Sequence, residues 1–253
     1  MSVPCVLVLA GHDPSGGAGM LADCEAIRAI GARALAVPTA LTVQTTLRVR
    51  KVHPVGTGYV LEAARALLAE EDVRAVKVGM LGTGLIAKAV FDLVKEIHDK
   101  RPELPVVLDP VLRSTSGAPL FRGTPAEARA AHMPLYPHVI LTPNAVEAQL
   151  LLDLVKQPTN ASEQVRAARL FTERGVRAAL VKGGHTEGPQ AIDVLAVGTK
   201  TTQLVSDRLI GKSARGTGCR LASALAAALA MGADLPTAAQ KAKNLVLGYL
   251  NAQ

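Results

Sequence analysis

The sequence predicts a three-layer α/β/α fold, in which helices cover both faces of a mostly parallel β-sheet. Three observations predict it. Short apolar runs rich in Val and Leu alternate with longer helical segments along most of the chain. These runs are apolar at nearly every position, as is typical of strands that are buried on both faces. The 253 residues are 49% hydrophobic but only 2% aromatic, so Ala, Val and Leu must fill the core of a single domain over residues 1–253.

In the first half of the chain, three predicted strands alternate with three predicted helices. The run VPCVLVLA predicts a buried strand, which a glycine-rich loop connects to a helix over residues 18–30. The run ARALAVPTAL predicts the next strand, and a polar loop separates it from a helix near residues 58–70. The run RAVKVGML predicts a third strand, followed by an amphipathic helix over residues 84–100.

The second half of the chain continues the alternation and then changes it. The runs PVVLDP and HVILTP predict two strands that end at prolines, and helices near 144–154 and 161–174 precede the strand AALVKGG. The segment IDVLAVGTKTTQLVSDRLI contains two β-runs separated by GTK, which predicts an antiparallel hairpin near the C-terminal end. Helices near 217–231 and 235–250 complete the predicted fold.

Composition excludes several classes of function. The chain has 28 Lys and Arg against 21 Asp and Glu, a balance that suits anionic ligands. The basic residues are scattered and no aromatic residues are interleaved with them, so nucleic-acid binding is not predicted. No apolar stretch reaches the length of a membrane helix. The cysteines Cys5, Cys24 and Cys219 lack metal-type spacing and predict reduced thiols, so we expect a cytoplasmic protein without membrane contact.

Ligands of such sheets bind beyond the carboxyl ends of the strands, where this chain has three glycine motifs. The motif GHDPSGGAG opens a helix but lacks the Gly-Lys-Ser/Thr of a Walker loop. The motif GTGLIA at 82–87 matches a dinucleotide-binding pattern, but a nicotinamide or flavin enzyme would leave the glycines near both chain ends unexplained. The third motif, RGTGC at 215–219, begins an apolar helix.

The third motif predicts an anion-binding site. Gly216, Thr217 and Gly218 would present consecutive N–H groups at the positive end of a helix dipole, and glycines let a phosphate come close. Cys219 lies in the first turn of the same helix, where the dipole is expected to favour the thiolate. An anion hole beside a proton acceptor is the equipment for phosphoryl transfer to a hydroxyl group.

The chain resembles the ribokinase superfamily and, within it, the hydroxymethylpyrimidine/phosphomethylpyrimidine kinases of thiamine biosynthesis. The resemblance rests on motifs that occur in order along nearly the whole chain: GHDPSGGAGMLAD, TALTVQTT, VKVGMLG, LDPVL, LTPNAVEA, LVKGGH and RGTGCRLASALAAALA. It implies a ribokinase-like fold, a homodimer and dependence on ATP and Mg²⁺. The implied reaction is phosphorylation of 4-amino-5-hydroxymethyl-2-methylpyrimidine, its monophosphate, or both.

The resemblance also implies roles for the residues that match the motifs. The anion hole and the base would be Gly216, Thr217, Gly218 and Cys219. The residues around the pyrimidine would be Gly11, Asp23, Gln44 and Met80. Asp109 and Glu147 would hold Mg²⁺, and Lys182 and Asn144 would bind the nucleotide.

Some of these residues also have simpler interpretations. Asn144 and Glu147 have the spacing of a helix capping box. Asp23 could be a carboxylate on a helix surface, Asp109 a turn residue before a proline, and Met80 a residue that fills the core.

Three positions depart from the family pattern. Arg215 stands where histidine is usual, Thr115 where lysine is usual, and Arg220 where threonine or serine is usual. We expect the Arg215 guanidinium to meet the phosphate of an already phosphorylated substrate. Two alternative functions stay open: pyridoxal kinase, because a pyridine that carries a hydroxymethyl group has a similar shape, and a weakly catalytic regulator that binds the pyrimidine, because of the departures at Arg215 and Thr115.

Overall fold

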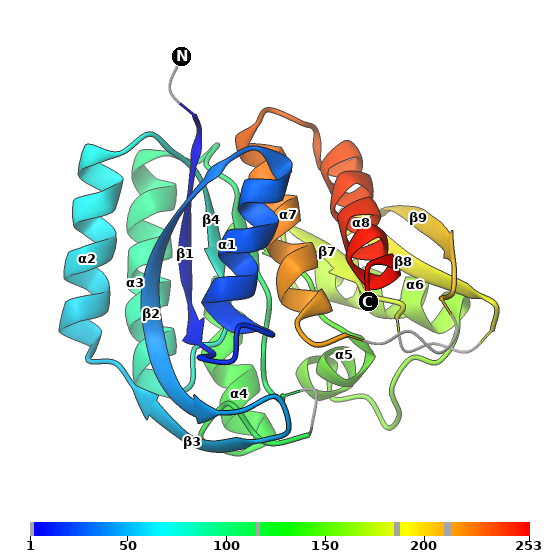
Figure 1. The fold of residues 1–253 in the computed structure, drawn as a ribbon. Coiled ribbons are helices and arrows are strands. Elements are labelled where there is room, and N and C mark those ends of the chain that lie inside the picture. Colours follow the sequence, from blue (N-terminus) through cyan, green and yellow to red (C-terminus); the bar gives the residue numbers. More distant parts are fainter. Residues whose placement is uncertain (1–2, 115–116, 185–187, 210–213) are drawn as a thin grey trace.

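The computed structural model describes residues 3–114, 117–184, 188–209 and 214–253 (Figure 1). The described strands form one nine-stranded sheet in the order β3-β2-β1-β4-β5-β6-β7-β8-β9. The strands are β1 (Cys5–His12), β2 (Arg33–Gln44), β3 (Val49–Pro54), β4 (Val73–Val78), β5 (Val106–Leu108), β6 (Ile140–Leu141), β7 (Ala178–Val181), β8 (Gln190–Val197) and β9 (Lys200–Asp207).

Helices cover both faces of this sheet and complete the predicted three layers. The helices are α1 (Gly19–Ile30), α2 (Thr57–Glu70), α3 (Gly84–Lys100), α4 (Pro125–His132), α5 (Ala145–Leu152), α6 (Ala161–Glu173), α7 (Thr217–Ala230) and α8 (Leu235–Asn251), with a 3₁₀ helix at Met133–His138. Helices α1, α7 and α8 pack together on one face, and α2, α3 and α6 lie on the other (Figure 1). None of the helices among the described residues is long and apolar enough to cross a membrane.

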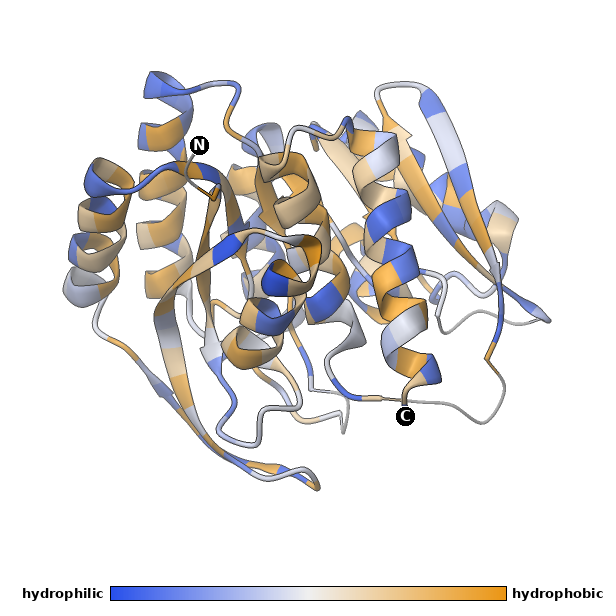
Figure 2. Cartoon of the chain, turned by 45° about the horizontal axis from the view of Figure 1, so that its top comes forward, coloured by the Kyte–Doolittle hydropathy of each residue, from blue (hydrophilic) through white to orange (hydrophobic). Residues whose placement is uncertain are grey.

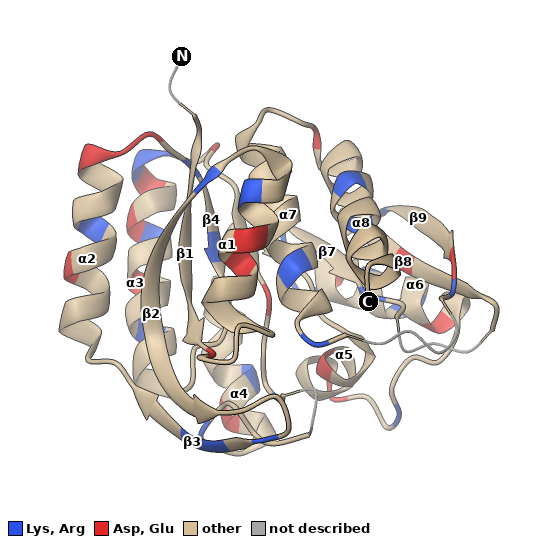
Figure 3. Cartoon of the chain, viewed as in Figure 1, with Lys and Arg blue, Asp and Glu red and all other residues tan. Residues whose placement is uncertain are grey.

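Strand β1 shows how the apolar runs build two cores at once. Val6 and Val8 pack into the core under α1, α7 and α8, whereas Leu7 and Leu9 pack into the core on the other face. All four side chains are fully buried because alternate residues of a strand point to opposite faces. Hydrophobic residues also line the helix sides that face the sheet (Figure 2), while charged residues of both signs lie mainly on helices and loops (Figure 3).

The predicted mostly parallel sheet and its antiparallel hairpin are confirmed. Strands β2, β1, β4, β5, β6 and β7 run parallel, and β8 and β9 form an antiparallel hairpin whose β8 also pairs antiparallel with β7. Helix α3 has the predicted bounds, and the other predicted helices begin and end within three residues of those expected. The strands expected at PVVLDP and HVILTP are shorter than expected, with three and two residues.

Three elements were not predicted: strand β3, helix α4 and the 3₁₀ helix at Met133–His138. Strand β3 occupies what we expected to be a polar loop, and it pairs antiparallel with the end of β2. Its sequence, VRKVHP, is mostly exposed, as is common for a charged edge strand, so no apolar run marked it. Helix α4 was also missed; it is short and begins with a Thr124 capping box.

The end of β2 and strand β3 form a two-stranded arm beside the carboxyl ends of the parallel strands (Figures 1 and 2). The arm exposes apolar side chains: Leu41 and Val43 are each 48% exposed, and Leu47 is 84% exposed. It carries Gln44, so this unpredicted arm brings one of the predicted site residues into place.

Candidate active site

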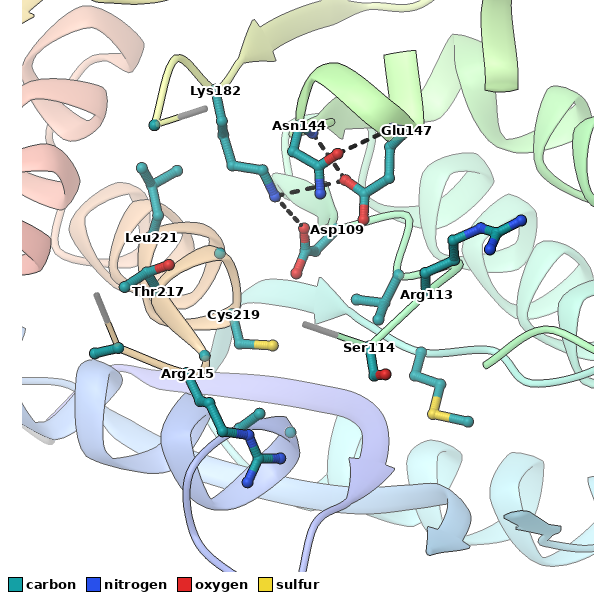
Figure 4. A pocket seen from close by; sticks show the side chains of 18 of the residues that line it. Asp109, Arg113, Ser114, Asn144, Glu147, Lys182, Arg215, Thr217, Cys219 and Leu221 are labelled. Carbon is teal, nitrogen blue, oxygen red and sulfur yellow. Dashed lines mark hydrogen bonds and ion pairs between the residues drawn. The ribbon is translucent and has the colours of Figure 1, made fainter. Parts of the chain in front are cut away.

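A cavity of about 540 Å³ lies at the carboxyl ends of the parallel strands, between the loops that follow them and the start of α7 (Figure 4). It is lined by every residue predicted for the site except Asp23. The C-terminal part of α8 closes one end with Val246, Leu247 and Leu250. Residues 82–87, the alternative dinucleotide motif, do not line it; Thr83 instead caps α3 by accepting the N–H of Ile86.

Helix α7 begins at the cavity without a side-chain cap. Gly216 is its N-cap residue in the left-handed conformation (φ 71°), and the N–H groups of the first turn have no partner within the helix. The two glycines are required for different reasons. A side chain on Gly216 would collide with the carbonyl oxygen of Gly17, whereas a Cβ on Gly218 would lie 3.1 Å from Nζ of Lys182. Gly216 is therefore needed for the backbone, and Gly218 keeps space for an ammonium group.

Cys219 lies in the first turn of α7 and faces the cavity (Figure 4). We expected the helix dipole to favour its thiolate. The structure corrects this expectation, because burial raises the pKa of the Cys219 thiol to about 12. Attraction to Lys77 lowers this pKa, but not enough to offset the loss of water around the sulfur. The thiol is therefore neutral at physiological pH in the ligand-free protein.

A cluster of two carboxylates and one lysine faces the start of α7. Lys182 donates to Oδ1 of Asp109 at 2.7 Å and lies 3.8 Å from Oε2 of Glu147 (Figure 4). Burial raises the pKa of Glu147 to about 7, with Lys182 lowering it and Asp109 raising it. Burial alone would lower the pKa of Lys182, but attraction to Asp109 and Glu147 raises it above its ordinary value.

Glu147 combines the two interpretations that the sequence left open. The Asn144 side chain accepts the N–H of Glu147 at 2.9 Å, and Glu147 accepts the N–H of Asn144 at 2.8 Å. This is a complete capping box for α5, and both residues also line the cavity. Asp109 likewise lines the cavity while its backbone continues the hydrogen bonding of β5.

The carboxylates of Asp109 and Glu147 are the groups that could hold a cation. Among the described residues, no three His, Cys, Asp or Glu side chains come together as a metal site. Mg²⁺ does not need such a cage, since it is commonly bound by one or two carboxylates together with water and substrate phosphates. The donor set therefore fits Mg²⁺ that arrives with a nucleotide.

The opposite end of the cavity contains Gly11, Gln44 and Met80. A side chain on Gly11 would place its Cβ 2.8 Å from the sulfur of Met80, so the glycine makes room for the methionine. Met80 is both a core residue, packed with Ala40 and Leu120, and part of the cavity wall.

Asp13 was missed by the sequence analysis. It is 3% exposed, lines the same end of the cavity and accepts a hydrogen bond from Nε2 of Gln44 at 3.2 Å. A buried aspartate within the GHDPSGGAG motif was the signal that could have identified it.

Asp23 is not where we expected it. It lies neither on the helix surface nor in the cavity wall, because its side chain is completely buried between α1 and the sheet. Nζ of Lys77 lies 2.8 Å from both carboxylate oxygens, and the Ser223 hydroxyl donates to Oδ1 at 2.7 Å. A buried carboxylate needs such partners, and they occupy it fully. Strand β4 carries two charges, Arg74 and Lys77, and Lys77, the buried one, was the unused signal.

Arg215 also differs from expectation. We expected its guanidinium to meet a substrate phosphate, but it donates to Oδ2 of Asp13 at 3.0 Å and to the Ser15 hydroxyl at 3.1 Å. It also donates to the carbonyl oxygen of Thr45 at 3.3 Å. The side chain therefore joins three loops at the Gln44 end of the cavity.

Arg220, the second departure, points away from the cavity. It pairs with Glu25 at 2.6 Å and lies over the ring of Tyr249, with its guanidinium carbon 4.0 Å from the ring centroid. Its long side chain therefore braces α7 against α1 and α8. The third departure, Thr115, lies outside the described residues.

Comparisons with known proteins agree with this geometry. A family model described as phosphomethylpyrimidine kinase matches residues 13–253. The hydroxymethylpyrimidine/phosphomethylpyrimidine kinase of Aquifex aeolicus is 35% identical over 241 residues, which cover 95% of this chain and 91% of the relative.

Two solved structures have the same fold. A phosphomethylpyrimidine kinase from Clostridium difficile superposes with a TM-score of 0.77 and 29% identity, covering 99% of each chain. A pyridoxal kinase from Staphylococcus aureus in complex with AMP-PCP and pyridoxal has a TM-score of 0.85 and 25% identity, covering 99% of this chain and 88% of its own.

Proposed function

The chain belongs to the phosphomethylpyrimidine kinase family, and we propose that it transfers the γ-phosphoryl group of ATP to a hydroxymethylpyrimidine. The acceptor would be 4-amino-5-hydroxymethyl-2-methylpyrimidine, its monophosphate, or both, in thiamine biosynthesis. The observation that carries the proposal is one cavity with three parts. The uncapped start of α7 lies between the Lys182 cluster on one side and the Gln44 end on the other.

The Lys182 side of the cavity suits the nucleotide. Apolar side chains of α8 offer a surface for a base, and Lys182 and Asn144 lie between that surface and the start of α7. The free N–H groups of Gly218 and its neighbours would hold the transferred phosphoryl group. Gly218 leaves Lys182 space to approach the same phosphates.

Asp109 and Glu147 would hold Mg²⁺, directly or through water. The bound ion would supply positive charge to the nucleotide phosphates. In the ligand-free protein Lys182 pairs with both carboxylates, and a nucleotide offers Lys182 a different anionic partner. Glu147, whose pKa is raised to about 7, would bind the cation better in its ionised form, so nucleotide binding should strengthen as pH rises through this value.

Gln44, Met80 and Gly11 would contact the pyrimidine ring and direct its hydroxymethyl group toward Cys219. We assign Cys219 as the group that accepts the hydroxyl proton. Its neutral thiol must first ionise, and the nearby ammonium groups of Lys77 and Lys182 favour the thiolate. The base would therefore form within the loaded active site rather than wait as a thiolate.

A pyridoxal kinase is the second candidate, because the pyridoxal kinase of S. aureus superposes over almost the whole chain. A coupled assay of ADP release with the hydroxymethylpyrimidine, its monophosphate and pyridoxal separates the candidates. We expect turnover with at least one of the two pyrimidines and a lower kcat/KM with pyridoxal. Binding of the pyrimidines without ADP release would instead identify a regulator, and preference for pyridoxal would overturn the proposal.

We also propose that the protein is a cytoplasmic homodimer. The exposed apolar side chains of the arm, Leu41, Val43 and Leu47, offer a surface that a second copy could cover. Light scattering after size exclusion should give about twice the chain mass, and a monomer at micromolar concentration would contradict this.

A further inference from the structure

We propose that Asp13 is a positioning residue that fixes the amide of Gln44 with its oxygen toward the substrate. The cavity then selects a ring edge that donates a hydrogen bond. The inference rests on the proposed function, because it concerns how the same site distinguishes its substrates. It assigns a role to a residue that the sequence motifs did not single out.

The Asp13 carboxylate is held rigidly. Its Oδ1 accepts the backbone N–H of Ser15 at 2.9 Å and the Ser15 hydroxyl at 2.7 Å. Its Oδ2 accepts from the N–H of Ala18 at 3.2 Å, from Nε2 of Gln44 at 3.2 Å and from Arg215 at 3.0 Å. Arg215 supplies the positive charge that a buried carboxylate requires. The carboxylate is therefore a fixed acceptor beside Gln44, surrounded by donors and paired with a guanidinium.

This acceptor determines which end of the Gln44 amide faces it. An ionised carboxylate has no proton to donate, so the amide must turn its NH₂ group toward Asp13 and its oxygen away. The opposite orientation would bring the amide oxygen against a negative charge.

Thr42, the other neighbour of the amide, does not favour the same orientation. Its hydroxyl lies 2.9 Å from the carbonyl oxygen of His12 and 3.2 Å from Oε1 of Gln44, but it has only one proton. The shorter bond, to His12, takes that proton, so the hydroxyl presents a lone pair to Gln44. Without Asp13, Thr42 would favour the opposite orientation of the amide, in which the NH₂ group of Gln44 could donate to the Thr42 hydroxyl. Asp13 is thus the group that holds the observed orientation.

The consequence is an amide oxygen that can accept from a donor on a ligand, because Gln44 lines the cavity and its Oε1 contacts only the Thr42 hydroxyl, at 3.2 Å, among the described residues. The amino group of an aminopyrimidine supplies such a donor. A ring with hydrogen at that position leaves the oxygen unpaired, and a ring with an acceptor there places two oxygens against each other. Asp13 therefore selects aminopyrimidines through Gln44 without any contact of its own with the amino group.

The first test uses the unmodified protein and three rings that differ only at the 4-position: amino, hydrogen and methoxy. Isothermal titration should rank their affinities amino, then hydrogen, then methoxy, with about tenfold between the first two. A freely turning amide would pair with either substituent, and the amino and methoxy rings would then bind about equally. That result would overturn the proposal without any variant.

The second test uses Asp13→Asn, which can no longer force the amide to one orientation. We expect its preference for the amino ring over the methoxy ring to fall at least about fivefold. The double variant Asp13→Asn/Gln44→Glu places a carboxylate at position 44, which offers only acceptors to the ring. Its preference for the amino ring over the methoxy ring should therefore return. Arg50→Met removes an exposed charge from β3 and serves as the matched control. A purely structural role would weaken all three rings by the same factor.

The outcomes separate the two proposals. If the unmodified protein binds none of the three rings, the proposed function fails. If it prefers the amino ring and folded Asp13→Asn keeps the full preference, the proposed function stands and the role of Asp13 fails. If Asp13→Asn does not fold, as thermal melting will show, the ranking of the three rings by the unmodified protein decides the question.

Discussion

The high pKa of Cys219 gives the proposed base a distinctive pH dependence. With a pKa of about 12, about one protein molecule in ten thousand carries the thiolate at pH 8. Since kcat/KM reports the ionisation of the free enzyme, its value for the pyrimidine should rise about tenfold per pH unit between pH 7 and pH 10. A base with an ordinary pKa would level off within this range.

The magnitude follows from where the sulfur lies. Ionising the thiol at pH 8 costs about 5 kcal/mol in the ligand-free protein, since one pKa unit is about 1.4 kcal/mol. This is an upper bound, because cavity water reaches part of the side chain. The loaded site must offset most of it through the cations around the sulfur. Cys219→Ala should therefore lower kcat by about two orders of magnitude or more, the usual contribution of a general base.

The assay is ADP release at saturating ATP and variable pyrimidine, from pH 6.5 to pH 10, with the unmodified protein, Cys219→Ala and Cys219→Asp. The Asp variant should lose the rise, because a carboxylate is already ionised across this range. A flat profile of the unmodified protein together with a large loss in Cys219→Ala would show that the thiol orients the substrate without accepting its proton. Near-normal turnover of Cys219→Ala would remove Cys219 from the reaction altogether.

Three further predictions test the surroundings of the site. Gln44→Leu should weaken pyrimidine binding about tenfold or more and leave ATP binding unchanged, and equal calorimetric affinities for the pyrimidine would contradict this. Lys77→Met should lower the free energy of unfolding, measured by urea titration, by about 3–5 kcal/mol, because it leaves Asp23 buried without its counter-ion. Adding Asp23→Asn to this variant should recover most of the lost stability. Glu147 has a folded pKa of about 7 against an ordinary value of 4.5, so its ionisation makes the protein lose stability as pH rises from 4.5 to 7. Glu147→Gln should therefore raise Tm more at pH 8 than at pH 5 while lowering kcat, and an equal shift of Tm at both values would refute the assignment.

The sequence predicted the fold well wherever apolar periodicity carried the signal. The parallel strands are buried on both faces, and their uniform hydrophobicity marked them without ambiguity. Strand β3 carried no such signal, because it is held by backbone pairing to β2 and its side chains are mostly exposed. An edge strand of this kind is specified by its partner rather than by its own sequence.

The site was predicted less completely than the fold. Motif resemblance placed the glycines, Gln44, Asp109, Glu147 and Lys182 around one cavity. It misplaced Asp23, whose carboxylate is paired with Lys77, and it gave no warning that Arg215 would pair with Asp13. The two residues of each pair are more than fifty residues apart in the sequence, and the fold brings them together. Motif spacing along the chain does not predict such pairs.

These buried ion pairs also explain how an alanine-rich core holds a defined site. On the face of α1, α7 and α8 the core consists largely of Ala, whose small side chains can slide past one another at little cost. Lys77 on β4 reaches Asp23 on α1, which in turn binds Ser223 on α7, one helical turn from Cys219.

At the Lys182 end of the cavity, Lys243 on α8 pairs with Asp193 on β8, and the other oxygen of Asp193 accepts the N–H of Gly183 next to Lys182. Each pair thus joins a helix that borders the cavity to a strand beneath it. Removing a charge from either pair leaves its partner buried without a counter-ion. A shift of these helices along the sheet would break the ion pairs. The small apolar side chains alone would oppose such a shift only weakly. Lys77, Asp193 and Lys243, which the sequence analysis overlooked, thus help to hold the predicted site residues in register.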